Sequence, residues 1–218
     1  MPFKDRSEAG RKLAKALAAY KDHDPVILAL PRGGVPVAAE VATALHAPLD
    51  LVLVRKIGLP IQPELAMGAV VDGGAPIIVR NEDVIAAADV SEAEFERVCR
   101  SELAEIERRR GHYLGGREAA EVEARVVIVI DDGLATGATM RAALRALRRR
   151  NPKRLVLAVP VAPSDTLEAM RGEADDIVCV EEHMFFGAIG AYYDDFRQVT
   201  DAELVTILAR FPPRKEGA

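Results

Sequence analysis

The chain has 218 residues, of which 50% are hydrophobic and 29% charged, as in an ordinary soluble globular protein. Its 29 Lys and Arg residues against 34 Asp and Glu residues give a formal net charge of −5. This balance argues against a chain-wide surface for nucleic acid or anionic membranes, but it allows a local basic pocket for a small anion. Neither Cys99 nor Cys179 lies in a CxxC or Cys/His cluster, so no disulfide framework or zinc site is indicated.

The sequence predicts one domain over residues 1–218, with no membrane segment and no secretion signal. The first six residues, Met-Pro-Phe-Lys-Asp-Arg, are not followed by an apolar signal segment. The longest apolar stretch, Leu155–Pro163, is far too short to span a bilayer. We therefore expect a cytoplasmic protein with neither a nucleic-acid nor a membrane partner.

Short apolar runs alternate with helix-period segments from the N-terminus onward. The apolar runs are rich in Leu and β-branched residues and lie at 26–30, 51–54, 126–130, 155–160 and 177–180. The helical patterns lie near 7–21, 35–46, 138–150 and 164–172. Because the runs are continuous, they suit strands that are covered on both faces. This order predicts an α/β fold with a doubly wound, mostly parallel sheet and a core over about 7–180.

Two segments interrupt this alternation. Residues 56–76 are rich in Gly and Pro, and we expect the short strand 77–79 after them to pair with 68–71 as an edge hairpin. Residues 91–114 predict a long inserted helix, which begins with a capping box made by Ser91 and Glu94. The arginine runs at 108–110 and 148–150 fall near helix C-termini, where we interpret them as solvated charges.

The most informative stretch runs from Val126 to Met140. A buried strand ends in two adjacent carboxylates, Asp131 and Asp132, and a short loop then leads into a helix. Ligands of open α/β sheets bind beyond the carboxyl ends of the strands, and a helix N-terminus suits a phosphate. The loop residues that can offer main-chain amides or hydroxyls are Ala135, Thr136, Gly137, Ala138 and Thr139.

The acidic pair cannot bind the same phosphate, because it needs a neutral polyol, a cation or a developing positive charge. The stretch therefore predicts a sugar phosphate, with hydroxyls toward Asp131 and Asp132 and phosphate toward 135–139. A plain strand-to-helix turn is the alternative. Two carboxylates at the end of a buried strand are costly, however, without a ligand or partner.

This stretch resembles the phosphoribosyl-pyrophosphate (PRPP) signature of type I phosphoribosyltransferases, which is a hydrophobic strand, two acidic residues and Thr-Gly-x-Thr. The residues from Asp131 to Thr139 match it position by position. The wider chain, from Phe3-Lys-Asp-Arg6 to Tyr193-Asp-Asp-Phe196, resembles bacterial predicted phosphoribosyltransferases of unassigned substrate. The resemblance implies a type I phosphoribosyltransferase-like fold with a C-terminal hood over about 181–199, and a homodimer.

The implied reaction is displacement at C1 of PRPP by a ring nitrogen of a nucleobase-like heterocycle, with release of pyrophosphate. The implied cofactor is Mg²⁺, held by Asp131 and Asp132 either directly or through PRPP and water. Two other functions stay open: a non-catalytic PRPP or nucleotide sensor, and a phosphohydrolase of an activated sugar phosphate. The sequence does not identify the acceptor base.

Leu30–Gly34 resembles the pyrophosphate loop of the same family. Gly33 and Gly34 expose main-chain amides, and Arg32 supplies a cationic fork for phosphate oxygens. The family often has an unusual cis peptide in this loop, so the resemblance implies a strained backbone between residues 31 and 33. By itself, the motif would be a strand-to-helix turn with a surface arginine. In the same chain as the acidic pair, we favour pyrophosphate binding.

Arg55 and Lys56 follow the second apolar run and can neutralise a leaving pyrophosphate. The resemblance implies that residues of about 57–67 form a flexible loop, which would close as a lid and exclude water from the activated sugar. A solvated surface loop is the alternative. The catalytic residues predicted in this way are Asp131, Asp132, Arg55 and Lys56.

Five aromatic residues lie between Glu182 and Phe196. In the family a variable hood holds the acceptor, and the candidates here for stacking on it are Phe185, Phe186, Tyr192 and Tyr193. Asp194 or Asp195 could accept a hydrogen bond from a ring N–H. A hydrophobic plug over the sheet explains the same cluster equally well.

The role of Arg117 has two interpretations. It could bind a phosphate, or it could simply follow a helix end with a glycine cap.

Overall fold

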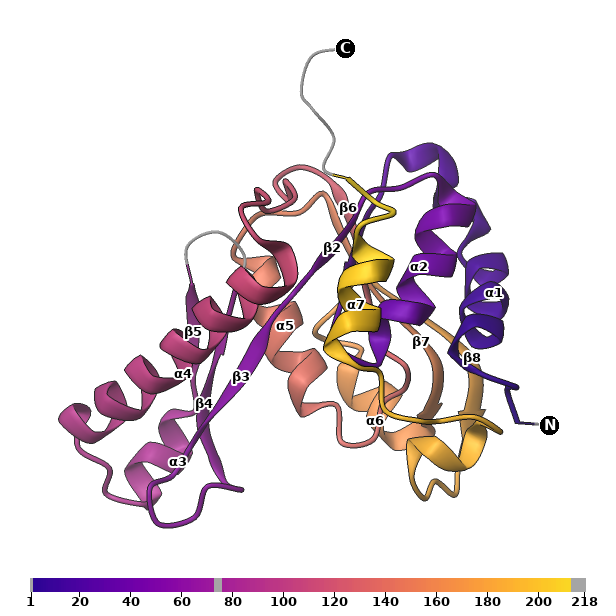
Figure 1. Cartoon of the computed structure of the whole chain (residues 1–218). Helices are drawn as coiled ribbons and strands as arrows, with labels where there is room; N and C mark the ends of the chain where they lie inside the picture. Colours follow the sequence, from indigo (N-terminus) through magenta and orange to yellow (C-terminus); the bar gives the residue numbers. More distant parts are fainter. Residues whose placement is uncertain (1, 73–75, 213–218) are drawn as a thin grey trace.

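The structure is a computed structural model that describes residues 2–72 and 76–212. Within these residues the strands form two sheets, one of five strands in the order β2-β1-β6-β7-β8 and one of three in the order β3-β4-β5 (Figure 1). Every pairing within the five-stranded sheet is parallel. The predicted α/β fold with a mostly parallel sheet is therefore confirmed.

The central sheet has helices on both faces. Its strands are β1 (Val26–Ala29), β2 (Leu49–Leu51), β6 (Val126–Ile130), β7 (Arg154–Pro163) and β8 (Asp176–His183). On one face Ile27 and Ile128 pack with α1 (Arg6–Ala16), α2 (Gly34–Leu45) and α7 (Asp201–Leu208). On the other face Leu28 and Val127 pack with α5 (Ala138–Arg148) and α6 (Ser164–Met170). This burial on both sides explains the continuous apolar runs.

The smaller sheet is antiparallel and consists of β3 (Val54–Gly58), β4 (Ala66–Val71) and β5 (Ile77–Arg80). The predicted pairing of 77–79 with 68–71 is confirmed, with Val71 opposite Ile77 and Ala69 opposite Val79. The expected edge hairpin is, however, two strands of a separate sheet. The predicted loop 57–67 is also shorter, because Ile57 and Met67 are fully buried strand residues and the turn covers 59–65.

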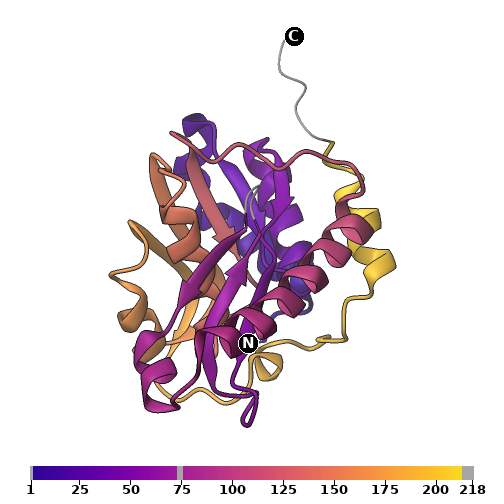
Figure 2. The same ribbon diagram turned by 90° about the vertical axis from the view of Figure 1, so that its left-hand side faces the viewer.

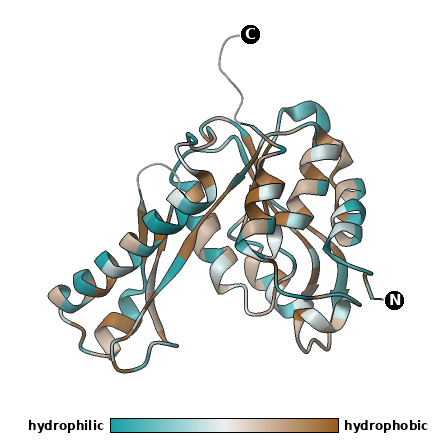
Figure 3. Cartoon of the chain, in the orientation of Figure 1, coloured by the Kyte–Doolittle hydropathy of each residue, from teal (hydrophilic) through white to brown (hydrophobic). Residues whose placement is uncertain are grey.

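Two helices sandwich the smaller sheet. The long helix α4 (Glu92–Leu114) packs against β3 and β4, and α5 contacts all three strands. Figure 2 shows α4 running along the strands of this sheet, and in Figure 3 its outer surface is largely hydrophilic. The capping box of Ser91 and Glu94 is present as predicted. Helix α5 thus contributes to both sheets, so its N-terminal loop lies between them.

The predicted solvated arginine runs need correction at two residues. Arg150 is half-buried, and this burial lowers its pKa. Arg108 and Arg109 pair with Glu105 on the same helix, as a solvated surface would allow. Arg110, in contrast, makes a 2.8 Å ion pair with Asp72, whose side chain is 5% exposed. This arginine is therefore part of the fold.

The remaining helices are α3 (Glu82–Ala87) and two 3₁₀ segments, η1 (Ala18–His23) and η2 (Ile189–Tyr192). Helix α7, which the sequence analysis did not predict, begins with a capping box of Thr200 and Glu203 and buries Leu204 and Leu208. Within the described residues, every helix is too short or too polar to cross a membrane.

Candidate active site

The predicted phosphate loop joins β6 to α5 and is open to solvent. Gly137 has a φ of +70°, a backbone conformation that favours glycine, and a Cβ there would displace the Met170 Cε, which lies 2.2 Å away. The Thr166 hydroxyl donates to the carbonyl oxygen of Ala135 at 2.8 Å and fixes the loop from the side of α6. Thr136 and Thr139 are exposed, so their hydroxyls and the loop amides are accessible.

A pocket of about 520 Å³ lies in front of this loop. Thr136, Ala138 and Thr139 form one side of the pocket, and residues of the smaller sheet form the other. Its basic lining residues are Lys56, Arg80, Arg141 and Arg145. Two acidic residues, Glu82 and Asp83, line the same pocket. The structure thereby brings the predicted phosphate loop and Lys56 to one cavity whose lining contains more basic than acidic side chains, a balance that suits an anionic ligand.

The two aspartates at the end of β6 are in different environments. Asp132 is 8% exposed, and its carboxylate accepts a hydrogen bond of 2.8 Å from the Arg6 Nε. Asp131 is half-buried, and its Oδ1 accepts the main-chain N–H of Asp132 at 2.8 Å. Burial first, and then the Asp132 carboxylate, raise the pKa of Asp131 well above its ordinary value.

The ion pair of Asp132 was not predicted, and it argues against two equivalent ribose ligands. Within residues 2–72 and 76–212 no basic side chain forms an ion pair with Asp131. Asp131 therefore remains available to a ligand, while one oxygen of Asp132 is already bound. The Phe3–Arg6 segment was included in the family resemblance but was assigned no role, so the contact of Arg6 with Asp132 was missed.

The predicted pyrophosphate loop packs directly on the acidic pair. A Cβ on Gly33 would lie 2.1 Å from Asp132 Oδ2, and one on Gly34 would lie 2.9 Å from Asp131 Cα. Both glycines are therefore needed for the close approach of the two loops. The peptide bond between Pro31 and Arg32 is cis, which confirms the unusual backbone expected there.

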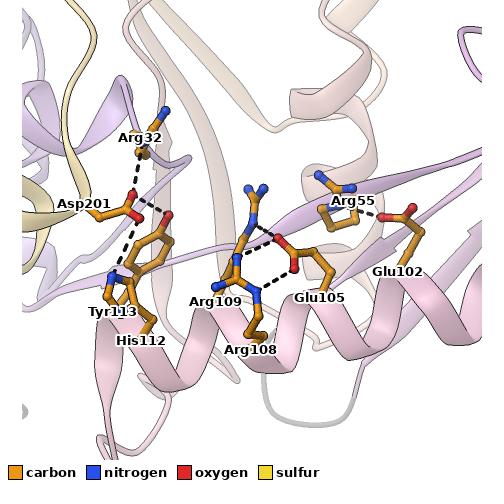
Figure 4. A network of polar contacts seen from close by, with 9 residues as sticks. All are labelled: Arg32, Arg55, Glu102, Glu105, Arg108, Arg109, His112, Tyr113 and Asp201. Atoms are coloured by element: carbon orange, nitrogen blue, oxygen red, sulfur yellow. Dashed lines mark hydrogen bonds and ion pairs between the residues drawn. The ribbon is translucent and has the colours of Figure 1, made fainter.

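The predicted pyrophosphate cations have internal carboxylate partners (Figure 4). Arg32 pairs with Asp201 at 3.1 Å, and Arg55 Nε donates to Glu102 at 2.6 Å. Asp201 also accepts from the hydroxyl of Tyr113, which lies three turns beyond Glu102 on α4, or about 16 Å along the axis. These partners keep the two guanidinium groups apart along α4. Lys56 donates to the Glu64 carbonyl oxygen and carboxylate, at 2.9 and 3.2 Å.

The predicted hood contains one residue that cannot stack on an acceptor in this arrangement. The ring of Tyr193 is 6% exposed and packs between Phe3 and Phe196, and its hydroxyl donates to the Asp132 carbonyl oxygen at 2.6 Å. Phe186 stacks on Tyr192 with ring centroids 4.8 Å apart. Phe185 is 93% exposed.

Arg117 has a structural position. Its guanidinium donates to the carbonyl oxygens of Leu49 and Leu208, and so joins the segment after α4 to the central sheet and to α7. Burial lowers the pKa of this arginine. The sequence left Arg117 open between phosphate binding and a helix end, and these contacts favour a structural role.

The end of β6 offers a metal ion two carboxylates, those of Asp131 and Asp132, rather than a complete ligand set. Within the described part of the chain, no three His, Cys, Asp or Glu side chains come together as a metal site. The half-buried carboxylate of Asp131 is a hard oxygen donor of the kind that Mg²⁺ prefers, so the residues present fit a shared magnesium ion. The remaining ligands would have to come from substrate and water.

Residues 5–196 match the family model described as the phosphoribosyl transferase domain. This chain belongs to the phosphoribosyl transferase family. The match includes both glycine-containing loops, the acidic pair and most of the hood. It confirms the predicted family and the class of domain, a pentosyltransferase of the phosphoribosyltransferase type.

Relatives and a solved structure support the same family. Two curated proteins of Mycobacterium tuberculosis, from strains CDC 1551 and H37Rv, are provisionally named phosphoribosyl transferases and are 43% identical over 208 residues. That alignment covers 95% of this chain and 46% of each relative, so the chain spans about half their length. The crystal structure of TT1426 from Thermus thermophilus is 41% identical, with a TM-score of 0.86, and the match covers 98% of this phosphoribosyl transferase chain and 100% of TT1426.

Proposed function

We propose that this phosphoribosyl transferase moves the phosphoribosyl group of PRPP to a ring nitrogen of a nucleobase-like heterocycle and releases pyrophosphate. The observation that carries the proposal is the open loop of residues 135–139, which lines a pocket with four basic side chains and begins just after the half-buried carboxylate of Asp131. A phosphate at the amides and hydroxyls of this loop would leave the sugar hydroxyls next to the acidic pair.

The acidic pair would act on the sugar. Asp131 would accept hydrogen bonds from ribose hydroxyls, and the charge of both aspartates would stabilise the positive charge that develops on the ring as the C1–O bond breaks. Asp131 and Asp132 would hold Mg²⁺, directly or through PRPP and water. When bound, this ion would supply charge neutralisation for the departing pyrophosphate.

The leaving pyrophosphate would bind the amide of Gly33 and the side chains of Arg32, Arg55 and Lys56. The predicted Gly34 amide is left out, because Gly34 is buried and its N–H already donates to the Leu30 carbonyl oxygen at 3.1 Å. These three cations would exchange Asp201, Glu102 and Glu64 for pyrophosphate oxygens. Partly exposed ion pairs of this kind contribute only about 0.2–1 kcal/mol each, so a polyanion can replace them at modest cost. The 59–65 turn, which follows Lys56, would then close over the site.

The acceptor would be held at the hood by Phe185, Phe186 and Tyr192. Stacking on these rings fits a flat heterocycle, and inversion at C1 would require this acceptor to approach the sugar from the face opposite the pyrophosphate. Tyr193 is left out of this set because its ring is buried.

We also propose that the protein forms a homodimer. Light scattering of the purified chain tests this proposal.

A pyrophosphate-release assay tests the function. The protein is incubated with Mg²⁺ and PRPP, and purines, pyrimidines and other nitrogen heterocycles are added one at a time. We expect release that depends on one class of base, and a loss of about 100-fold in Asp131→Asn, as for removal of one preorganised charge from an active site. Asp22→Asn, at an exposed site on η1, is the matched control.

The same assay separates the alternatives. Binding of PRPP with no release for any base would identify a sensor, and release without a base would identify a phosphohydrolase. If Asp131→Asn releases pyrophosphate at the wild-type rate, the acidic pair does not take part in the reaction.

A further inference from the structure

Arg6, the first residue of α1, is 9% exposed and reaches the end of β6. Its Nε donates to Asp132 Oδ2 and its Nη1 to the carbonyl oxygen of Arg197, both at 2.8 Å. The guanidinium also lies 4.0 Å from the ring centroid of Phe196. One buried arginine therefore connects the acidic pair to the hood.

A second connection runs beside the first. The N–H of Phe3 donates to the Tyr192 carbonyl oxygen and the N–H of Asp194 donates to the Phe3 carbonyl oxygen, both at 2.8 Å. The hydroxyl of Tyr193 from the same segment donates to the Asp132 carbonyl oxygen. The N-terminal segment and the hood thus form one unit, which holds Asp132 at both its side chain and its main chain.

The position of Asp131 depends on that of Asp132. The Asp131 carboxylate is bonded to the N–H of Asp132, and the glycines of the pyrophosphate loop pack against both residues. Without Arg6, the buried charge of Asp132 would have no partner and would repel the neighbouring carboxylate. Asp132 would then move toward water, and the oxygens of Asp131 would lose their fixed direction.

We infer that Arg6 is a positioning residue for the sugar half of the substrate: it holds Asp132 and, through Asp132, orients Asp131 toward the ribose hydroxyls. Arg6 is not itself placed as a phosphate ligand, since its hydrogen bonds are directed to Asp132 and to Arg197. This inference rests on the proposed function, because it assumes that a ribose phosphate occupies the loop of residues 135–139.

Two simple ligands separate this role from a general structural one. Inorganic phosphate probes the loop 135–139, whereas ribose 5-phosphate probes the loop and the acidic pair together. Calorimetry would measure both affinities for the wild type, Arg6→Lys, Arg6→Met and the double variant Arg6→Met/Asp132→Asn. Arg11→Met is the matched control, because Arg11 lies on the same helix with its side chain 56% exposed.

We expect the Arg6 variants to bind phosphate like the wild type and ribose 5-phosphate about tenfold more weakly, as for loss of a charged hydrogen bond. Lysine keeps the charge without the planar fork, so Arg6→Lys should lose less than Arg6→Met. The double variant buries no unpaired charge, so its melting temperature should lie closer to that of the wild type than the melting temperature of Arg6→Met does. It should still lack the preference for ribose 5-phosphate.

Wild-type affinity for ribose 5-phosphate in folded Arg6 variants would overturn the inference, and so would a parallel loss of both ligands. If the single Arg6 variants do not fold, the double variant is compared with Asp132→Asn alone. An equal preference for ribose 5-phosphate in these two proteins overturns the inference, and a weaker preference in the double variant, with phosphate binding retained, supports it. A wild-type protein that binds ribose 5-phosphate no better than phosphate would instead overturn the proposed function, and this inference with it.

Discussion

Arg32 Nη1 lies 3.1 Å from Asp201 Oδ1, so a residue predicted to bind pyrophosphate already has an anionic partner inside the protein. The hydroxyl of Tyr113 donates to the same oxygen at 2.9 Å, and this bond first, and then Arg32, lower the pKa of Asp201. The N-terminus of α7 therefore competes with a ligand for Arg32.

Removal of this carboxylate should strengthen pyrophosphate binding. In Asp201→Asn the Arg32 charge has no anionic competitor, so we expect an affinity for pyrophosphate about two- to fivefold higher, the size of a partly exposed ion pair. Calorimetric titration at low salt measures it. Glu96→Gln, an exposed acid on α4, should leave the affinity unchanged. Weaker binding in Asp201→Asn would show instead that Asp201 orients Arg32.

Gly137→Ala should damage the phosphate loop. An alanine at a φ of +70° costs about 1–2 kcal/mol, and its methyl group would also displace the end of the Met170 side chain. We expect a lower melting temperature and a loss of phosphate binding. Gly172→Ala is the control, because a Cβ at Gly172 meets nothing within 4 Å. Equal melting temperatures for the two variants would contradict the described geometry.

Tyr193→Phe should reduce stability while leaving the ring packing intact. The lost hydroxyl leaves the Asp132 carbonyl oxygen unbonded in a buried position, which costs about 1 kcal/mol or somewhat more. Urea unfolding measures this cost. Tyr192→Phe should change the free energy of unfolding by less than about 0.5 kcal/mol, because its hydroxyl is at the surface. The reverse order would contradict the hydrogen bond from the Tyr193 hydroxyl to the Asp132 carbonyl oxygen.

The pair of Arg108 and Arg109 around Glu105 predicts an acid-sensitive contribution to stability. Hydrogen bonds from Arg108 and then Arg109 lower the pKa of Glu105 from 4.5 to about 2. A lowered pKa in the folded state stabilises the fold above pH 4.5, and this contribution is lost as the pH falls toward 2. Glu105→Gln should therefore unfold at lower urea concentration than the wild type at pH 7, but at the same concentration near pH 2.

Glu107→Gln provides the matched control for this pH dependence, because Glu107 is an exposed acid on the same helix. We expect its urea midpoint to follow that of the wild type at every pH. A difference between Glu105→Gln and the wild type that persists at pH 2 would exclude titration of Glu105 as the cause.

The sequence was informative where local chemistry determines structure. The apolar run 126–130, the acidic pair and Gly137 lie within one strand, one turn and one helix start, so their arrangement follows from neighbours in the chain. The pairs of Arg6 with Asp132 and Arg32 with Asp201 join residues more than 100 positions apart. Periodicity carries no signal for such partners, and a charged residue in a sequence looks the same whether it faces water or a buried carboxylate.

The smaller sheet was missed for a related reason. Residues 54–58 contain Arg55 and Lys56, which suggest a solvated turn, yet the next residue, Ile57, is fully buried in the core that includes α4. The pairing of β3 with β4 depends on a helix that comes some forty residues later in the chain. Propensity alone could identify the strand 77–79 but not the sheet to which it belongs.

The position of α5 between two sheets restricts how its sequence can vary. From Met140 to Arg148, every residue is buried except Arg141, Arg145 and Arg148, which follow one edge of the helix. Their ion-pair partners are Glu173 and Asp175, in the connection from α6 to β8. Substitutions in this helix should therefore be tolerated along one narrow stripe. In a library randomised over 140–148, the variants that fold should carry polar substitutions only at the positions of those three arginines.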